Sequence, residues 1–170
     1  PWSGGSSLGT YDASNLDDQI PMYALNNEQA GFSFTLATDE SIQYIQLSLD
    51  KIGNPSGACN VKIYASTGTS GTDALPTGSA LAVSTNVSAS DLTGSFSLYD
   101  FSFEDPLSAV AGDYVFLLEY VGGDVNNHIR IGVDSSSPGN TGSNIVCSHT
   151  RGANWFADVN KDVVFNLFKA

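Results

Sequence analysis

Apolar and polar residues alternate along much of the chain, the pattern of strands with one buried and one solvated face. In the stretch SIQYIQLSLDKI, Ile45, Leu47 and Leu49 alternate with polar neighbours. The same period of two in CNVKIYAS points Val61 and Ile63 inward. These stretches are therefore predicted to be strands that share one core.

Two later stretches extend this pattern. In NHIRIGVDSS, three apolar residues alternate with His128, Arg130 and Asp134, so these polar side chains are predicted to face solvent. YVFLLEYVGG is apolar at consecutive positions. A strand that is apolar on both faces is expected in the middle of a sheet.

No segment keeps the apolar stripe and caps that an amphipathic helix requires. About nine strands separated by turn residues predict an all-β, antiparallel two-sheet β-sandwich. The loops are too short for the crossover helices of a parallel sheet. Residues 1–18 are interpreted as a Gly/Ser-rich linker or lead-in arm, and residues 19–170 as one β-sandwich domain.

Composition narrows the choice of partners. Only 14% of the residues are charged, against roughly 25% in an average soluble domain. The net charge is −12, which repels nucleic-acid phosphates and anionic membrane surfaces, so we expect neither as a partner. No window of about 18 apolar residues is present, so no membrane insertion is expected.

The two cysteines, Cys59 and Cys147, lie far apart and each belongs to a strand-like run. A long-range disulfide requires two strands to bring them within a few ångströms. Two separate buried thiols are the alternative, because free cysteine is among the most buried residue types. The sequence leaves both open.

The order of the stretches carries a resemblance to a known family. FSFTL, SIQYIQLSLDKIGNPSG, VKIYA, LPTGSALAVS, FSFEDPLSAVAGDYVFLLEY and NHIRIGVDSSSPG follow one another. This order resembles a jelly-roll domain of secreted bacterial surface proteins and phage appendage proteins, similar to carbohydrate-binding modules. The resemblance covers roughly residues 28–169. It implies a jelly-roll β-sandwich that binds or displays, and an extracellular or virion location.

The stretch SHTRGANW resembles an Asp-box hairpin, Ser-x-Asp-x-Gly-x-x-Trp, with Thr150 where aspartate is usual. In such a hairpin a side-chain oxygen at the third position bonds turn amides. Gly152 is expected to adopt positive φ. Trp155 is then expected to fold back as a structural staple, which competes with a role in ligand binding.

For catalysis the sequence offers little. The nucleophile motif G-x-S-x-G is absent, and neither His128 nor His149 lies in a triad pattern. The acidic pairs are adjacent residues, which point to opposite sides of an extended chain. They are poor candidates for the convergent carboxylates of a glycosidase. The protein is predicted not to be an enzyme.

Sugar binding requires an aromatic platform and planar polar groups. Four candidates lie on one strand and its lead-in, and four come from other segments. The predicted ligand-binding residues are Tyr64, Asn126, Asn127, His128, Arg130, Arg151, Asn154 and Trp155. For Arg130 a cross-strand pair with a carboxylate is an equally weighted alternative.

A calcium loop is the one cofactor site that the sequence suggests. In DVNKD, Asp158, Asn160 and Asp162 stand at alternate positions, like the first half of such a loop. Val163 stands where the sharp turn requires glycine. A structural calcium ion and a solvated acidic turn are therefore alternatives, and no other cofactor is expected.

The expected function is that of a non-catalytic carbohydrate-binding or adhesion domain, in a secreted surface protein or a phage tail or head appendage. Its partner would be a glycan or polysaccharide. The alternative is a structural virion decoration or fibre module that contacts only other virion or surface proteins.

Overall fold

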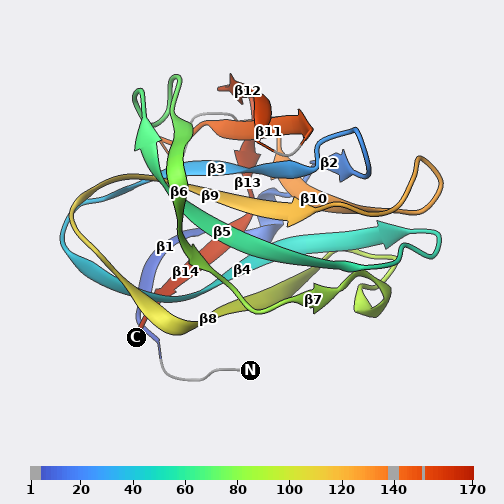
Figure 1. Cartoon of the computed structure of the whole chain (residues 1–170), viewed down its shortest axis with the longest axis horizontal. Helices are drawn as coiled ribbons and strands as arrows, with labels where there is room; N and C mark the ends of the chain where they lie inside the picture. Colours follow the sequence, from blue (N-terminus) through green and yellow to red (C-terminus); the bar gives the residue numbers. More distant parts are fainter. Residues whose placement is uncertain (1–4, 138–141, 151) are drawn as a thin grey trace.

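The computed structural model describes residues 5–137, 142–150 and 152–170, which form two antiparallel β-sheets (Figure 1). Sheet 1 comprises β1 (Ser7–Tyr11), β2 (Asp18–Met22), β4 (Glu40–Ile52), β8 (Ser97–Ala109), β10 (His128–Asp134), β13 (Asp162–Val163) and β14 (Phe165–Lys169). Sheet 2 comprises β3 (Gln29–Leu36), β5 (Ala58–Thr67), β6 (Leu75–Val83), β7 (Val87–Ser88), β9 (Gly112–Tyr120), β11 (Ile145–Thr150) and β12 (Ala153–Asp158).

The all-β, two-sheet antiparallel class predicted from the sequence is confirmed, but the described residues form fourteen strands rather than about nine. The difference includes short strands such as β7 and β13, two residues each, which are too short to show a period. Two 3-10 turns, η1 (Ala13–Asn15) and η2 (Ala89–Asp91), complete the elements. Within the described ranges no helix is long and apolar enough to cross a membrane.

The core lies between the sheets, where the alternating apolar residues meet. Ile45, Leu47 and Leu49 of β4 are buried, as predicted. Phe32 of sheet 2 stacks on Phe165 of sheet 1 with ring centroids 4.2 Å apart. Offset aromatic contacts of this kind add to the free energy that burial itself supplies. The two layers are thus joined through an aromatic contact at their centre.

Strand β9 occupies the central position that its apolar character predicted. It pairs with β3 along one edge and with β5 along the other. Its residues Val115 and Leu117 face away from the core and are nevertheless buried. The outer face of sheet 2 therefore has a small apolar cluster of its own.

The segment interpreted as a linker or lead-in arm contributes a strand to sheet 1. β1 pairs with β14, at the opposite end of the sequence. Its last residue, Tyr11, is buried and donates its hydroxyl to Asp134 of β10. From Ser7 onward this segment is part of the sandwich.

Two of the three polar residues of β10 are buried, contrary to the prediction, and the third, Arg130, is partly exposed. Asp134 is 1% exposed and His128 is 9% exposed. The segment between β1 and β2 crosses the outer side of β10, where a Cβ on Gly132 would lie 2.6 Å from Cδ1 of Leu16. His128 packs instead against the ring of Tyr23, 5.6 Å away. The alternation in the sequence predicted correctly which side chains of β10 point away from the core. It did not predict that other segments cover that outer face.

The sandwich has two seams where the edges of the sheets approach each other. At one seam β6, which pairs only with β5 among the described strands, faces β8, which pairs only with β4. At the other seam β2, the partner of β10, faces β12, the partner of β11. Each seam contains a cleft.

Candidate functional site

The cleft at the second seam, the β2–β12 cleft, brings together an aromatic ring, amides and charges. Its volume is about 200 Å³. It is lined by Gln19, Ile20, Pro21, Asn27, Ile145, Cys147, Phe156, Asp158 and Lys161. The mixture of apolar floor and a few polar groups is typical of small-molecule sites.

Phe156 supplies the aromatic surface of this cleft. Its side chain remains 39% exposed, an unusual state for a phenylalanine, while Cys147 opposite it on β11 is buried. The ring of His149 lies 5.4 Å from the Phe156 ring. A flat apolar face thus stands open to solvent beside a buried floor.

Asn27 supplies an unsatisfied polar group. It follows the turn after β2 with φ +50°, a left-handed conformation that asparagine tolerates better than most residues. Its Nδ2 donates to the carbonyl of Pro21 (3.2 Å), but its Oδ1 is buried with no partner among the described residues. A buried acceptor without a donor is rare and costly, and it calls for an explanation.

Charged groups stand at the mouth of the β2–β12 cleft. Nζ of Lys161 donates to Oδ2 of Asp18 (2.6 Å), and this hydrogen bond holds the pKa of Asp18 below its ordinary value. Oδ1 of Asp158 accepts the backbone N–H of Asn160 at 2.8 Å. The rim therefore carries the carboxylates of Asp18 and Asp158 and the ammonium group of Lys161, which is paired with Asp18.

Tyr64 and Trp155, two of the predicted ligand residues, are brought together on the outer face of sheet 2. Both pack against the cluster of Val115, Leu117 and Val146. Gly152 has φ +73°, as the Asp-box resemblance implied. Trp155 is thus placed as a staple that holds the β11–β12 hairpin on sheet 2.

The turn between β9 and β10 lies at one end of the sandwich (Figure 1). It contains Asn126 and Asn127, and His128 is the first residue of β10. Asp124 accepts the backbone N–H groups of both asparagines, and these bonds hold the pKa of Asp124 below its ordinary value. Oδ1 of Asn127 also accepts the N–H of Asn54, in the turn after β4. Both asparagines therefore take part in hydrogen bonds that stabilise these turns.

Arg130 takes the cross-strand pair that was its alternative. It lies opposite Asp50 in the β4–β10 register, and its Nε donates to Oδ1 of Asp50 at 2.8 Å. A second donor of the guanidinium binds the other carboxylate oxygen, and the group also lies 5.3 Å from the centroid of Phe96. The hydrogen bonds to Asp50 raise the pKa of Arg130 further above its ordinary value.

The remaining predicted residues fall in several places. Asn154 is the second residue of β12 and is exposed, with φ +55°. Arg151 lies outside the described residues. The predicted ligand residues are therefore spread over both outer faces and one end of the sandwich, rather than gathered in one cleft.

The segment with the calcium-like spacing forms the turn between β12 and β13. Asp158 bonds the turn itself, whereas Asp162 is buried and accepts the hydroxyl of Ser143 at 3.2 Å. In the described part of the chain, no group of three or more His, Cys, Asp or Glu side chains is placed to hold a metal ion. Among the predicted residues that the structure describes, Asp158 is also the one that lines the β2–β12 cleft.

The cysteines are separate buried thiols rather than a disulfide. Burial raises the pKa of each thiol to about 12. Cys147 contributes its apolar surface to the floor of the cleft. The alternative of two buried thiols is the one that the structure contains.

Sequence reasoning missed Phe156 and Asn27. The hairpin motif drew attention to Trp155, but adjacent residues of a strand face opposite sides, so only its neighbour reaches the seam. Asn27 lies in a short turn with no periodic pattern. Comparison of the chain with protein-family models, with curated proteins and with solved structures finds no match.

Proposed function

We propose that this protein binds glycans without cleaving them, as a domain of a secreted surface protein or a phage appendage. The β2–β12 cleft holds one sugar ring of the glycan. The observation that carries the proposal is the unpartnered Oδ1 of Asn27 in a cleft that also exposes the ring of Phe156.

The chemistry of the cleft matches the two faces of a sugar. The C–H face of a pyranose ring packs on Phe156, as apolar sugar faces do on aromatic rings. A sugar hydroxyl then donates to Oδ1 of Asn27, which removes the cost of the buried unpaired acceptor. Gln19, Asp158 and Lys161 supply further donors and acceptors at the rim.

The volume of the cleft favours a single sugar ring, and its carboxyl groups favour binding without hydrolysis. The cleft, at about 200 Å³, is smaller than the roughly 300–1,000 Å³ of sites for drug-sized ligands. Among the described residues that line it, Asp158 is the one carboxylic acid, and the Asp18 carboxylate at its mouth is paired with Lys161. Most glycosidases need two carboxyl groups across the bond they cleave. This cleft therefore favours recognition over catalysis.

Titration with simple sugars tests the proposal. The probes are glucose, galactose, mannose, N-acetylglucosamine and fucose, followed by amide chemical shifts in a ¹⁵N-labelled sample. We expect at least one sugar to shift the amides of β2, β11 and β12, with a Kd on the order of 1 mM, or about −4 kcal/mol. No shift with any of the five sugars, or shifts confined to other elements, would overturn the proposal.

Two neighbouring aromatic residues provide a matched control. Phe156→Ala removes the platform and should abolish the sugar-induced shifts, and Asn27→Ala should weaken them. Trp155→Phe changes the adjacent residue, which faces the outer cluster of sheet 2, and should leave the sugar affinity unchanged. Equal losses in the two aromatic variants would mean that the cleft is not the binding site.

An architectural role is the second candidate, and one observation favours it. Leu25 and Val125 are 75% and 64% exposed at the tips of two turns, which the N–H of Ala24 and the carbonyl of Gly122 join at 3.0 Å. Leu25 also has φ +67°, an unusual backbone state for a branched apolar residue. Exposed apolar residues at adjacent tips are a mark of protein contacts.

Self-assembly is the direct test of this second candidate. Light scattering over a wide concentration range should show an oligomer for the native chain and a monomer for the Leu25→Ser, Val125→Ser double variant. A monomer at every concentration in both proteins would count against a contact between copies through these tips.

A further inference from the structure

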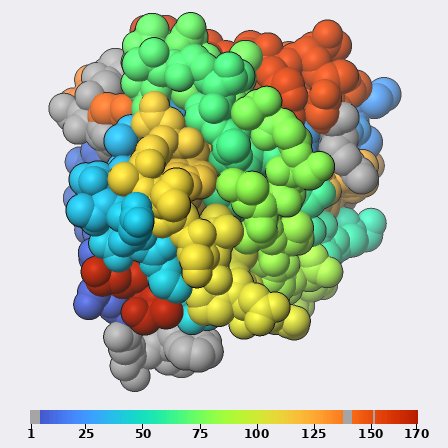
Figure 2. Space-filling model, turned by 60° about the vertical axis from the view of Figure 1, so that its left-hand side comes forward, coloured from blue at the N-terminus to red at the C-terminus, as the bar shows by residue number. Residues whose placement is uncertain are grey.

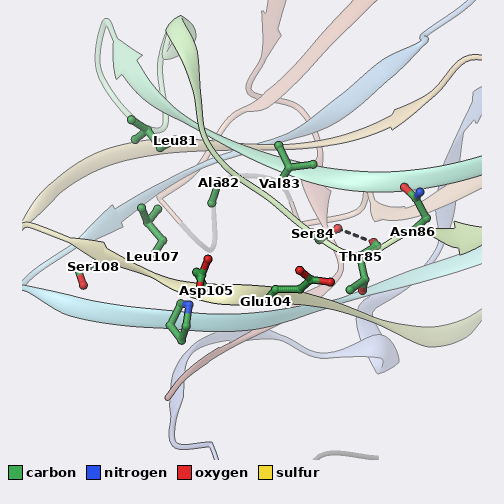
Figure 3. A pocket seen from close by; sticks show the side chains of 11 residues that line it. Leu81, Ala82, Val83, Ser84, Thr85, Asn86, Glu104, Asp105, Leu107 and Ser108 are labelled. Atoms are coloured by element: carbon green, nitrogen blue, oxygen red, sulfur yellow. Dashed lines mark hydrogen bonds between the residues drawn. The ribbon is translucent and has the colours of Figure 1, made fainter.

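The cleft at the other seam is larger than the β2–β12 cleft and separate from it. This β6–β8 groove has a volume of about 700 Å³. Residues 81–86, from β6 and the chain that follows it, form one wall, and residues 104–108 of β8 form the other (Figure 3). The two segments lie side by side on the surface in Figure 2, in green and yellow.

A bulge in β8 shapes the groove. Ile42 pairs with Leu107 and Tyr44 pairs with Ser102, so residues 103–106 of β8 lie opposite the single residue Gln43. Nε2 of Gln43 donates to the carbonyl of Phe103 (3.0 Å) and fixes the bulge from behind. Bulges re-aim side chains at sheet edges. Here the bulge holds the segment from residue 104 to 106 beside the groove.

The groove continues a backbone pairing that is already present. The N–H of Thr85 donates to the carbonyl of Ser102 at 2.8 Å, so at this point the chain leaving sheet 2 is bonded to the free edge of β8. Beyond it the two edges diverge, and neither β6 nor β8 has a second strand partner among those described. Unpaired edge groups of this kind are templates for an added strand.

The charge of the groove is negative. Glu104 and Asp105 are both exposed and lie between the two strands in Figure 3. None of the lining residues is lysine or arginine. A second copy of this chain carries only six lysine and arginine residues against 18 aspartate and glutamate residues, so it complements the carboxylates of this groove poorly. The occupant that the electrostatics favour is therefore cationic and foreign to this chain.

Exposed and more buried apolar side chains alternate along the β6 wall. Leu81 and Val83 are 48% and 50% exposed, on either side of the more buried Ala82. Leu107 lies across the groove and packs on the core. An extended peptide that alternates apolar and basic residues would place its apolar side chains against this wall and its basic ones near the carboxylates.

We propose that the β6–β8 groove binds an extended, basic peptide segment of a partner protein. About five residues of the peptide lie between the two edges, with their cationic side chains at Glu104 and Asp105. The length follows from the other wall, residues 81–86, since a peptide strand rises about as far per residue as the chain it lies along.

The test uses a fluorescently labelled nonapeptide in which lysine and valine alternate. The same peptide with glutamate in place of lysine is the charge control, and one with N-methylated backbone amides is the pairing control. We expect the lysine peptide to bind, with amide shifts in β6 and β8, and added salt to weaken it. The glutamate peptide should not bind, and N-methylation should weaken binding.

Single-charge variants locate the site. Glu104→Gln and Asp105→Asn should each weaken the lysine peptide about two- to fivefold, the range that exposed ion pairs contribute. Asp91→Asn, which removes one exposed charge outside the groove, is the matched control and should change the affinity less than either. No binding of the lysine peptide, shifts that map elsewhere, or equal losses in all three variants would each overturn the proposal.

Discussion

The backbone N–H of Gly152 donates to Oε1 of Gln29 at 2.8 Å, so a side chain of β3 holds the tip of the β11–β12 hairpin. Nε2 of the same amide donates to Oε2 of Glu119 (2.9 Å), and Oε1 of Glu119 accepts from Lys62 (2.8 Å). Four segments are therefore connected across the outer face of sheet 2. Gln29 is buried, so both ends of its amide depend on these partners.

Replacing this amide tests the connection. Gln29→Met keeps the length of the side chain but leaves the Gly152 N–H and one oxygen of Glu119 without the bonds they have now. We expect a loss of about 1–3 kcal/mol in the free energy of unfolding, measured by denaturant titration. The same change at the exposed Gln19 should cost less than about 0.5 kcal/mol. Equal effects at the two positions would contradict the prediction.

Removing one partner of the Arg130–Asp50 pair should destabilise the fold more than removing both charges. Asp50 is 1% exposed, so Arg130→Met leaves a buried carboxylate unpaired and should destabilise the fold by about 3 kcal/mol. Adding Asp50→Asn to that variant should recover part of the loss. Lys169→Met at the more exposed pair with Glu40 (3.1 Å) is the control and should cost less than about 1 kcal/mol. A double variant no more stable than Arg130→Met would argue against a charge effect.

Tyr11 should affect stability in a pH-dependent way. Hydrogen bonds, first from Tyr11 and then from Ser136, lower the pKa of Asp134 in the folded protein. A lowered carboxyl pKa adds stability that is present above the unfolded value of about 3.9 and is lost as the pH falls through the folded pKa. Tyr11→Phe should therefore destabilise the protein at neutral pH, and the difference should vanish in acid. Denaturant titrations across the acidic range would measure it, and a difference independent of pH would contradict it.

The two thiols should resist alkylation in the folded protein. Their pKa values of about 12 leave almost no thiolate at about pH 8, where an ordinary thiol is partly ionised. We expect iodoacetamide to label Cys59 and Cys147 only after unfolding, as followed by mass spectrometry. Since the folded pKa is raised, stability from these groups is lost as the pH rises from about 9 towards 12. Equal labelling rates in folded and unfolded protein would refute the prediction.

Local patterning predicted the layers but not the clefts. Ile45, Leu47 and Leu49 are buried and β9 is central because alternation and apolar runs are properties of one strand. The prediction that Asp134 is exposed is wrong because the segment between β1 and β2, which is far away in sequence, covers its side of β10. Phe156 reaches a seam whose other wall is β2, and no local pattern links β12 to β2.

The pairing of β14 between β1 and β4 has a consequence for biosynthesis. A ribosome releases β1 and β4 long before it releases Phe165 and Leu167, the residues with which β14 fills the core. Until then sheet 1 lacks the strand that joins β1 to it, and β4 has not yet gained β14 as a neighbour. Sheet 1 therefore remains incomplete during synthesis until β14 has left the exit tunnel.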